Sequence, residues 1–290
     1  TTLEEAICDE QFINHLDRTP ELANYLIVPE GDVPAEETSA APAAAQINLS
    51  RYEVNNGTLI YDDRTTETYL KIEGLTTTGD GDFTATIFDL DTDSKADAVT
   101  LQQGGITYLN EVEATAVALV NVDLNDSRYT FLDNKVTLNA LDLIFSGSID
   151  LEDNDDILFD LEYQAPVNDF HQLWSLIPSA YTSGYEDVRT TGKFTLNGTV
   201  NGPYNGKKKI YPAFTVNTEV SSGSVQYPGR AVGITGIDAK VSVNSPSADL
   251  NEMVIDIPRF DFDLGGDPFR GRLKLSTPLS DPNVDARVQG

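Results

Sequence analysis

A regular alternation of apolar and polar residues is the feature of this sequence that most limits its fold. In EVEATAVALVNVDL, residues 111–124, every even-numbered residue is apolar, whereas Glu113, Thr115 and Asp123 are polar. Side chains that alternate between two faces are typical of a half-buried β-strand. The alternation recurs from Ile47 onward, and Asp-Asn, Gly-Asp, Asn-Gly and Pro-Gly pairs interrupt it as turns between antiparallel strands do. The sequence therefore predicts an all-β, mainly antiparallel fold.

Two segments depart from this period. In KVTLNALDLIFSGSID, residues 135–150, the apolar positions change from even to odd numbers, which we interpret as a β-bulge near Ala140. Residues 167–188 combine an apolar helical face with a break at Pro178, so we expect one short helix near 168–184.

The N-terminal part has a different composition. Residues 3–27 have apolar spacings compatible with helix, interrupted at Pro20, whereas PEGDVPAEETSAAPAAA has almost no large apolar residue and is typical of a linker. No initiator methionine is present, and we expect a processed or excised piece of a longer chain. The predicted organisation is a helical segment, a linker and two related β-units joined by the short helix: 1–28, 29–45, and 46–290 with units at about 46–165 and 190–290.

One nine-residue sequence motif occurs twice. EVNNGTLIY, residues 53–61, is matched in order by EVSSGSVQY, residues 219–227. Gly57 and Gly223 would supply a positive φ at a turn or bulge. We therefore interpret the motif as the same hairpin, present once in each of two duplicated β-units. The alternative is chance reuse of a common hairpin sequence.

The charge balance excludes one class of partner. Nineteen Lys+Arg against 47 Asp+Glu give a formal net charge of -28, which repels phosphate backbones and anionic membrane surfaces. We therefore exclude nucleic-acid binding. The single Cys8 excludes an intramolecular disulfide, and no run approaches the roughly 18 apolar residues of a membrane-spanning helix.

Catalytic signatures are not found. Nucleophilic catalysis usually needs a histidine base beside the nucleophile, and the chain has only His15 and His171, neither in a catalytic motif. Carboxylate pairs are too abundant to identify a glycosidase. We expect a protein that is not an enzyme.

Cation binding is an open alternative. Asp89, Asp91 and Asp93 have the spacing of the first half of a calcium-binding loop, but Ser94 replaces its glycine and no bidentate Glu follows. The pattern predicts at most a weakly bound Ca²⁺ and no other cofactor. Solvated acidic turns that keep sheet edges from pairing are the other interpretation.

The long strands suggest a binding surface. A strand of about ten residues spans roughly 33 Å, and one continuous apolar face could line a curled sheet as well as fill a sandwich core. Periodicity does not separate these two possibilities. The residues that we expect to line an apolar groove are Val136, Leu138, Phe159, Leu161, Phe194, Leu196, Phe260, Phe262 and Leu273.

The order of several segments resembles a known family. INLSRYEVNNGTLIYDD, GITYLNEVEATAVALVNVDL, FHQLWSLIPSAYTSGYEDVRTTGKFTLNGTV and EMVIDIPRFDFDLGGDPFRGRLKLS are similar to the AsmA-like proteins of the Bacteroidota, over about residues 46–290. These proteins are related to TamB and to the bridge-like lipid-transfer proteins. The resemblance implies an elongated, curled sheet of repeated β-units that forms a groove, without catalytic residues.

The resemblance also implies a function and a location. It implies a periplasmic protein, anchored to the inner membrane in its full-length form, that carries or shields phospholipid between the inner and outer membranes and supports outer-membrane assembly. Phospholipid, the two membranes and further envelope proteins would be its partners. The alternative from another class is a structural or adhesive β module of the cell envelope, to which calcium could add stability.

Overall fold

The computed structural model describes residues 5–9, 12–17, 50–152, 156–174, 188–227, 229, 232–247, 249–278 and 280–290. Almost all of them belong to one sheet, and the all-β, antiparallel prediction is confirmed. From β3 onward each strand pairs with the next in the chain, whereas β1 and β2 both pair with β3 in parallel. The strands are β1 (Glu5–Asp9), β2 (Phe12–Asp17), β3 (Arg51–Asp63), β4 (Thr68–Asp80), β5 (Ile87–Gln103), β6 (Ile106–Asp123), β7 (Arg128–Leu138), β8 (Leu141–Leu151), β9 (Ile157–Asp169), β10 (Arg189–Tyr204), β11 (Ala213–Gln226), β12 (Ile234–Ser245), β13 (Val254–Leu264), β14 (Asp267–Ser276) and β15 (Asn283–Gln289).

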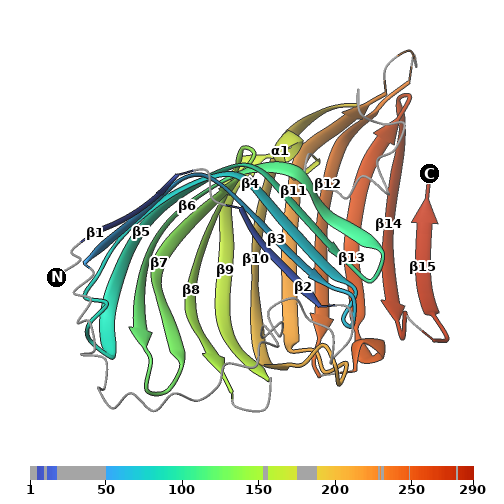
Figure 1. The fold of residues 1–290 in the computed structure, drawn as a ribbon. Helices are drawn as coiled ribbons and strands as arrows, with labels where there is room; N and C mark the ends of the chain where they lie inside the picture. The colour runs from blue at the N-terminus through green and yellow to red at the C-terminus, as the bar shows by residue number, and fades with distance from the viewer. Residues whose placement is uncertain are drawn as a thin grey trace, which may run out of the picture.

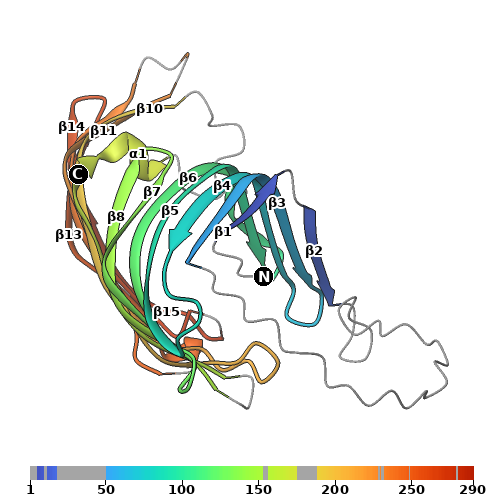
Figure 2. The same cartoon turned by 60° about the vertical axis from the view of Figure 1, so that its left-hand side comes forward.

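The sheet is a single, strongly curled layer. Figure 1 shows β3 to β6 crossing obliquely in front of the later strands, and Figure 2 shows the same strands arching over from the wall that β8 to β14 form. Short helices are the only other elements among the described residues: α1 (Phe170–Trp174) and a 3₁₀ turn, η2 (Leu250–Glu252). No helix in the described part of the chain is long and apolar enough to cross a membrane.

β-bulges bend the strands of this sheet. In the β3–β4 ladder, the paired positions first advance by three residues on β3 and two on β4. They then advance by two residues on β3 and three on β4. The β11–β12 ladder repeats the same two shifts at the same spacing. The successive partners are Val54–Thr77, Gly57–Leu75 and Leu59–Ile72 in the first ladder, and Val220–Ala239, Gly223–Ile237 and Val225–Ile234 in the second. A bulge increases local twist and bend, so these ladders curl the sheet.

The repeated sequence motif forms this bend in a strand and not a hairpin. Asn56 and Ser222, the residues before the two glycines, both have a φ of +51°, and Asn and Ser are short polar residues at a position that costs other side chains strain. Gly74 and Gly236 have φ values of +64° and +60° in the following strands. The interpretation of the motif as a hairpin was wrong, because each copy begins within a strand that continues through the bulge.

The change of apolar positions from even to odd numbers after Val136 has a different cause from the β-bulge that we predicted. Residues 139–140 form the turn between β7 and β8, with Asn139 at a φ of +53°, so Ala140 is in a hairpin and not at a bulge. The bulge of this ladder lies between Phe131 and Asn134.

The N-terminal helix prediction is wrong for the residues that the structure describes. Residues 5–9 and 12–17 are the strands β1 and β2. An open edge of β3 offers backbone hydrogen bonds to any extended segment, and such tertiary pairing overrides a weak helical propensity. The remainder of 1–28 and the predicted linker 29–45 lie outside the described residues.

The expected helix near 168–184 is present but short. α1 covers only Phe170–Trp174, and residues 175–187 lie outside the described part of the chain. The strands on either side of this segment, β9 and β10, pair directly. The two predicted β-units are therefore halves of one continuous sheet.

Candidate functional site

Cross-strand pairing divides the sheet into an apolar face and a polar face. Partners in register share a face, and pairs such as Leu161–Val200 and Phe262–Phe269 lie on one side, whereas Thr199–Thr215 and Lys240–Arg259 lie on the other. The buried hydrophobic residues of the described strands all belong to the first side: Ala96, Val112, Val120, Val122, Leu141, Ala165, Phe194 and Val220. In a single layer, only the curl and α1 can shield one face, so the apolar side is the concave face.

Every residue that we predicted to line an apolar groove lies on this concave face. The set is Val136, Leu138, Phe159, Leu161, Phe194, Leu196, Phe260, Phe262 and Leu273. Phe194 is only 1% exposed, and the others are half-buried. Half-burial is what a concave surface without a second layer produces.

The prediction missed concave-face residues that the same period would have found. Tyr163 pairs with Phe145 on one side and Gly198 on the other, and Val216 pairs with Val243. The aromatic rings are close: Phe131 and Phe145 have centroids 5.3 Å apart, and Phe262 lies between Phe260 and Phe269 at 6.0 and 5.3 Å. Apolar side chains therefore line the concave face on β7, β8, β13 and β14, whereas Thr77, Thr92 and Ser94 form a hydrogen-bonded polar cluster on the same face of β4 and β5.

Two tyrosines cross this surface over a glycine. Tyr163 Oη donates to the carbonyl oxygen of Thr215 at 2.9 Å, across Gly198, where an added Cβ would lie 2.4 Å from the ring. Tyr52 crosses Gly79 on β4 in the same way, and its hydroxyl lies 3.2 Å from Oγ1 of Thr92 on β5. Burial raises the pKa of Tyr163, which keeps its hydroxyl protonated as a donor.

Loops bring the two walls together at one end of β10. Gln103 Nε2, at the end of β5, donates to Tyr204 Oη at 3.2 Å, although 101 residues separate the two in the chain. The adjoining loop 205–210 is fixed by Asp156, which accepts from Asn205 Nδ2 at 2.5 Å and Lys208 Nζ at 3.0 Å. Asn205 is 2% exposed. The ammonium group of Lys208 is thus paired with the carboxylate of Asp156.

The helix α1 covers the other end of β10. Leu141, Ala165, Phe194 and Val220 form a buried cluster against which Phe170 of α1 packs. His171 on the same helix has its Nδ1 3.3 Å from Thr190 Oγ1. His15 lies in β2.

The acidic residues proposed for calcium lie on the outer, polar face. Asp89, Asp91 and Asp93 occupy alternate positions of β5 and are exposed, with Asp89 accepting from Asn121 Nδ2 at 2.7 Å. An extended strand separates residues i and i+2 by about 7 Å, so these carboxylates form a row and do not converge. Within the described residues there is no group of three or more His, Cys, Asp or Glu that could hold a metal.

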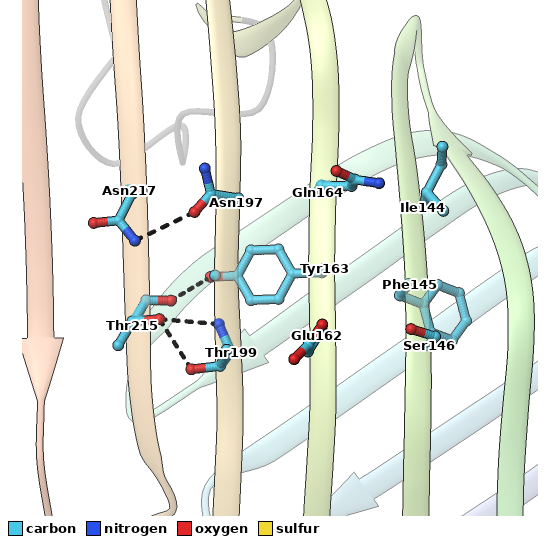
Figure 3. Close-up of a pocket in the computed structure, with 11 residues that line it drawn as sticks. Ile144, Phe145, Ser146, Glu162, Tyr163, Gln164, Asn197, Thr199, Thr215 and Asn217 are labelled. Carbon is cyan, nitrogen blue, oxygen red and sulfur yellow. Dashed lines mark hydrogen bonds between the residues drawn. The ribbon is translucent and has the colours of Figure 1, made fainter.

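The outer face also contains a polar hollow of about 420 Å³, drawn in Figure 3 with β3 to β6 behind the sheet. Two cross-strand rows supply most of its lining: Ser146, Glu162, Thr199 and Thr215, and Ile144, Gln164, Asn197 and Asn217. Asn217 Nδ2 donates to Asn197 Oδ1 at 3.3 Å, and the hydroxyls of Thr199 and Thr215 lie 2.9 Å apart. Nothing in the sequence period marks this hollow.

Comparison of the chain with protein-family models, curated proteins and solved structures gives no significant match.

Proposed function

We propose that this chain shields the acyl chains of phospholipid on its concave face and carries them between the inner and outer membranes of a cell envelope. The observation that carries the proposal is a single-layered, curled sheet whose concave face is mainly apolar, whereas its outer face is mainly polar. The polar side would face the periplasm. In this proposal the protein is an AsmA-like, non-catalytic envelope protein that supports outer-membrane assembly, and its full-length form is anchored to the inner membrane.

The proposed mechanism is transfer along a surface. Each CH₂ group moved from water to an apolar surface gains about 0.8 kcal/mol, so ten methylene groups would gain about 8 kcal/mol. Neighbouring strands are about 4.8 Å apart, and the strands in sequential pairing give a lining of roughly 60 Å. Because apolar side chains follow one another from strand to strand, a chain can move along the lining at nearly constant free energy.

The headgroup remains in water in this proposal. The lining offers aliphatic and aromatic side chains and few charges, so it does not select a headgroup. Burying an ionised phosphate without a partner would cost several kcal/mol, which is more than such a surface returns. The acyl chain is therefore the recognised part.

The test is native mass spectrometry with lipid extraction on the protein expressed in a bacterial envelope, together with uptake of a fluorescent phospholipid. Leu161→Gln on the concave face should reduce the lipid-bound fraction at least threefold. Leu132→Gln, the same change on the outer face, should leave it unchanged. Phe194 is unsuitable for the test, because it is buried beneath α1 and its replacement would unfold the cluster.

The outcomes are distinct. Equal lipid binding by both variants, or no uptake by the wild-type protein whose sheet is intact by circular dichroism, would overturn the proposal. The structural or adhesive module of the envelope would then be the better interpretation.

A further inference from the structure

Three aliphatic side chains on the outer face have no role in lipid shielding. Val117, Leu119 and Leu132 are 53%, 41% and 48% exposed. Leu119 pairs with Leu132 across β6 and β7, and Val117 is two residues from Leu119 on the same strand and face. They form an apolar patch on a face that is mainly polar, and exposed apolar patches of this kind are where partner proteins bind.

The charges on one side of this patch are unbalanced. Asp91 pairs in register with Leu119, and Asp93 pairs with Val117. Among the described residues neither carboxylate has an ion pair, whereas Lys95 on the same strand contacts both Asp97 and Glu113. Two exposed carboxylates beside exposed aliphatic groups complement a ligand that is apolar and cationic.

The other side of the patch leads into the hollow. Lys135, the other partner of Val117, pairs with Ile144, and Ile144 is one of the residues that line the hollow in Figure 3. Lys135 is itself neutralised by Asp142, whose carboxylate lies 2.9 Å away. The surface is thus an acidic strand, an apolar patch and a recess, in that order from β5 to β11.

We propose that this outer surface is a docking site for a second protein, which contributes an amphipathic helix with an aliphatic stripe flanked by lysine or arginine. A helix places residues i and i+4 about 6 Å apart, which matches the spacing of about 7 Å between Val117 and Leu119 on one strand. An anionic membrane surface is disfavoured, because a chain of net charge -28 is repelled by it. The proposal does not depend on lipid binding, which uses the opposite face.

The experiment measures binding of a fluorescein-labelled amphipathic Leu/Lys helical peptide to the whole chain by anisotropy at physiological ionic strength. Leu119→Thr/Leu132→Thr should weaken binding at least tenfold, and threonine keeps the β propensity of these exposed sites. Asp91→Asn/Asp93→Asn should weaken it about threefold or more and reduce its dependence on salt.

Matched variants elsewhere on the outer face separate docking from general attraction. Ile87→Thr removes an aliphatic group that is also 53% exposed, and Asp160→Asn removes an acid of β9 that does not line the hollow and whose partners in register are the polar residues Ser148 and Asn201. Both should bind within about twofold of the wild type. A peptide with the leucines replaced by glutamine should bind at least tenfold more weakly.

Equal weakening in the matched variants, or equal binding of the glutamine peptide, would overturn the docking site and leave only attraction to an acidic surface. Phospholipid uptake by the Leu119→Thr/Leu132→Thr variant should equal that of the wild type. Circular dichroism confirms that the variant is folded, so the docking test does not depend on the test of lipid binding.

Discussion

Tyr163 on β9 donates a hydrogen bond of 2.9 Å from its hydroxyl to the carbonyl oxygen of Thr215 on β11, two strands away. The ring can cross β10 only because Gly198 has no side chain: an added Cβ would lie 2.1 Å from the same carbonyl oxygen. This contact ties three strands together on the concave face. A tyrosine that lies flat over a glycine also keeps the lining smooth where a ring would otherwise project.

Gly198→Ala should therefore destabilise the fold by about 2 kcal/mol or more, since the neighbour it meets is backbone. Tyr163→Phe loses only the hydrogen bond and should cost about 1 kcal/mol. Urea unfolding followed by circular dichroism measures both. Tyr108→Phe, at a tyrosine that is 46% exposed, is the matched control and should be neutral. A neutral Gly198→Ala would contradict the close approach.

Asp63 gives the fold a pH dependence. Asp63 is 5% exposed, and this burial opposes ionisation of its carboxyl group, but hydrogen bonds from Thr65 and Thr66 outweigh it and lower the pKa below its ordinary value of 3.8. A lowered folded-state pKa means that the ionised carboxylate stabilises the turn 64–67 above the unfolded-state pKa. That contribution is lost as the pH falls through the folded-state pKa.

Asp63→Asn should destabilise the protein by about 1 kcal/mol at neutral pH, and the difference from the wild type should shrink below about pH 4. Thermal melting of both proteins between pH 7 and pH 3 measures it. A difference that is constant with pH would show that the carboxylate charge is not involved.

The bulges at Asn56 and Ser222 should not accept β-branched residues. Asn56→Val and Ser222→Val force such a side chain to a φ of +51° and should each cost about 1–2 kcal/mol. Asn56→Gly should be neutral or stabilising. Thr58→Val, within the same strand, is the control for the change in polarity. The midpoints of urea unfolding report each effect, and a neutral Asn56→Val would contradict the left-handed conformation.

Calcium should have little effect on stability. Because Asp89, Asp91 and Asp93 form a row on an extended strand, millimolar Ca²⁺ should raise the melting temperature by about a degree or less. A larger rise that Asp89→Asn/Asp91→Asn/Asp93→Asn abolishes would favour the calcium-stabilised structural module.

The contact between Gln103 and Tyr204 should hold the two walls together. Tyr204→Phe removes an interaction of 3.2 Å between residues on β5 and β10 and should increase hydrogen exchange in the turn 64–67 and the loop 205–210. Exchange in α1, at the other end of β10, should not change. Uniform exchange changes in both places would mean that the variant is globally destabilised.

The sequence by itself determined the strands and the division of residues between two faces. A period of two is a local property, and register pairing carries it from strand to strand, so Phe159 and Leu273 share a face although four strands lie between β9 and β14. Which residues share a face was predictable for this reason. The repeat of EVNNG as EVSSG also correctly marked two equivalent places in the chain.

Only the tertiary structure decided the curvature and what surrounds the two faces. The bend at Asn56 and Ser222 depends on two successive register shifts between strands, and the contact of Gln103 with Tyr204 joins residues distant in the chain. The same holds for β1, which takes the open edge of β3 against its own helical pattern. Local alternation specifies which side of a strand is apolar. Pairing, bulges and long-range contacts determine whether that side is concave and what remains exposed on the other.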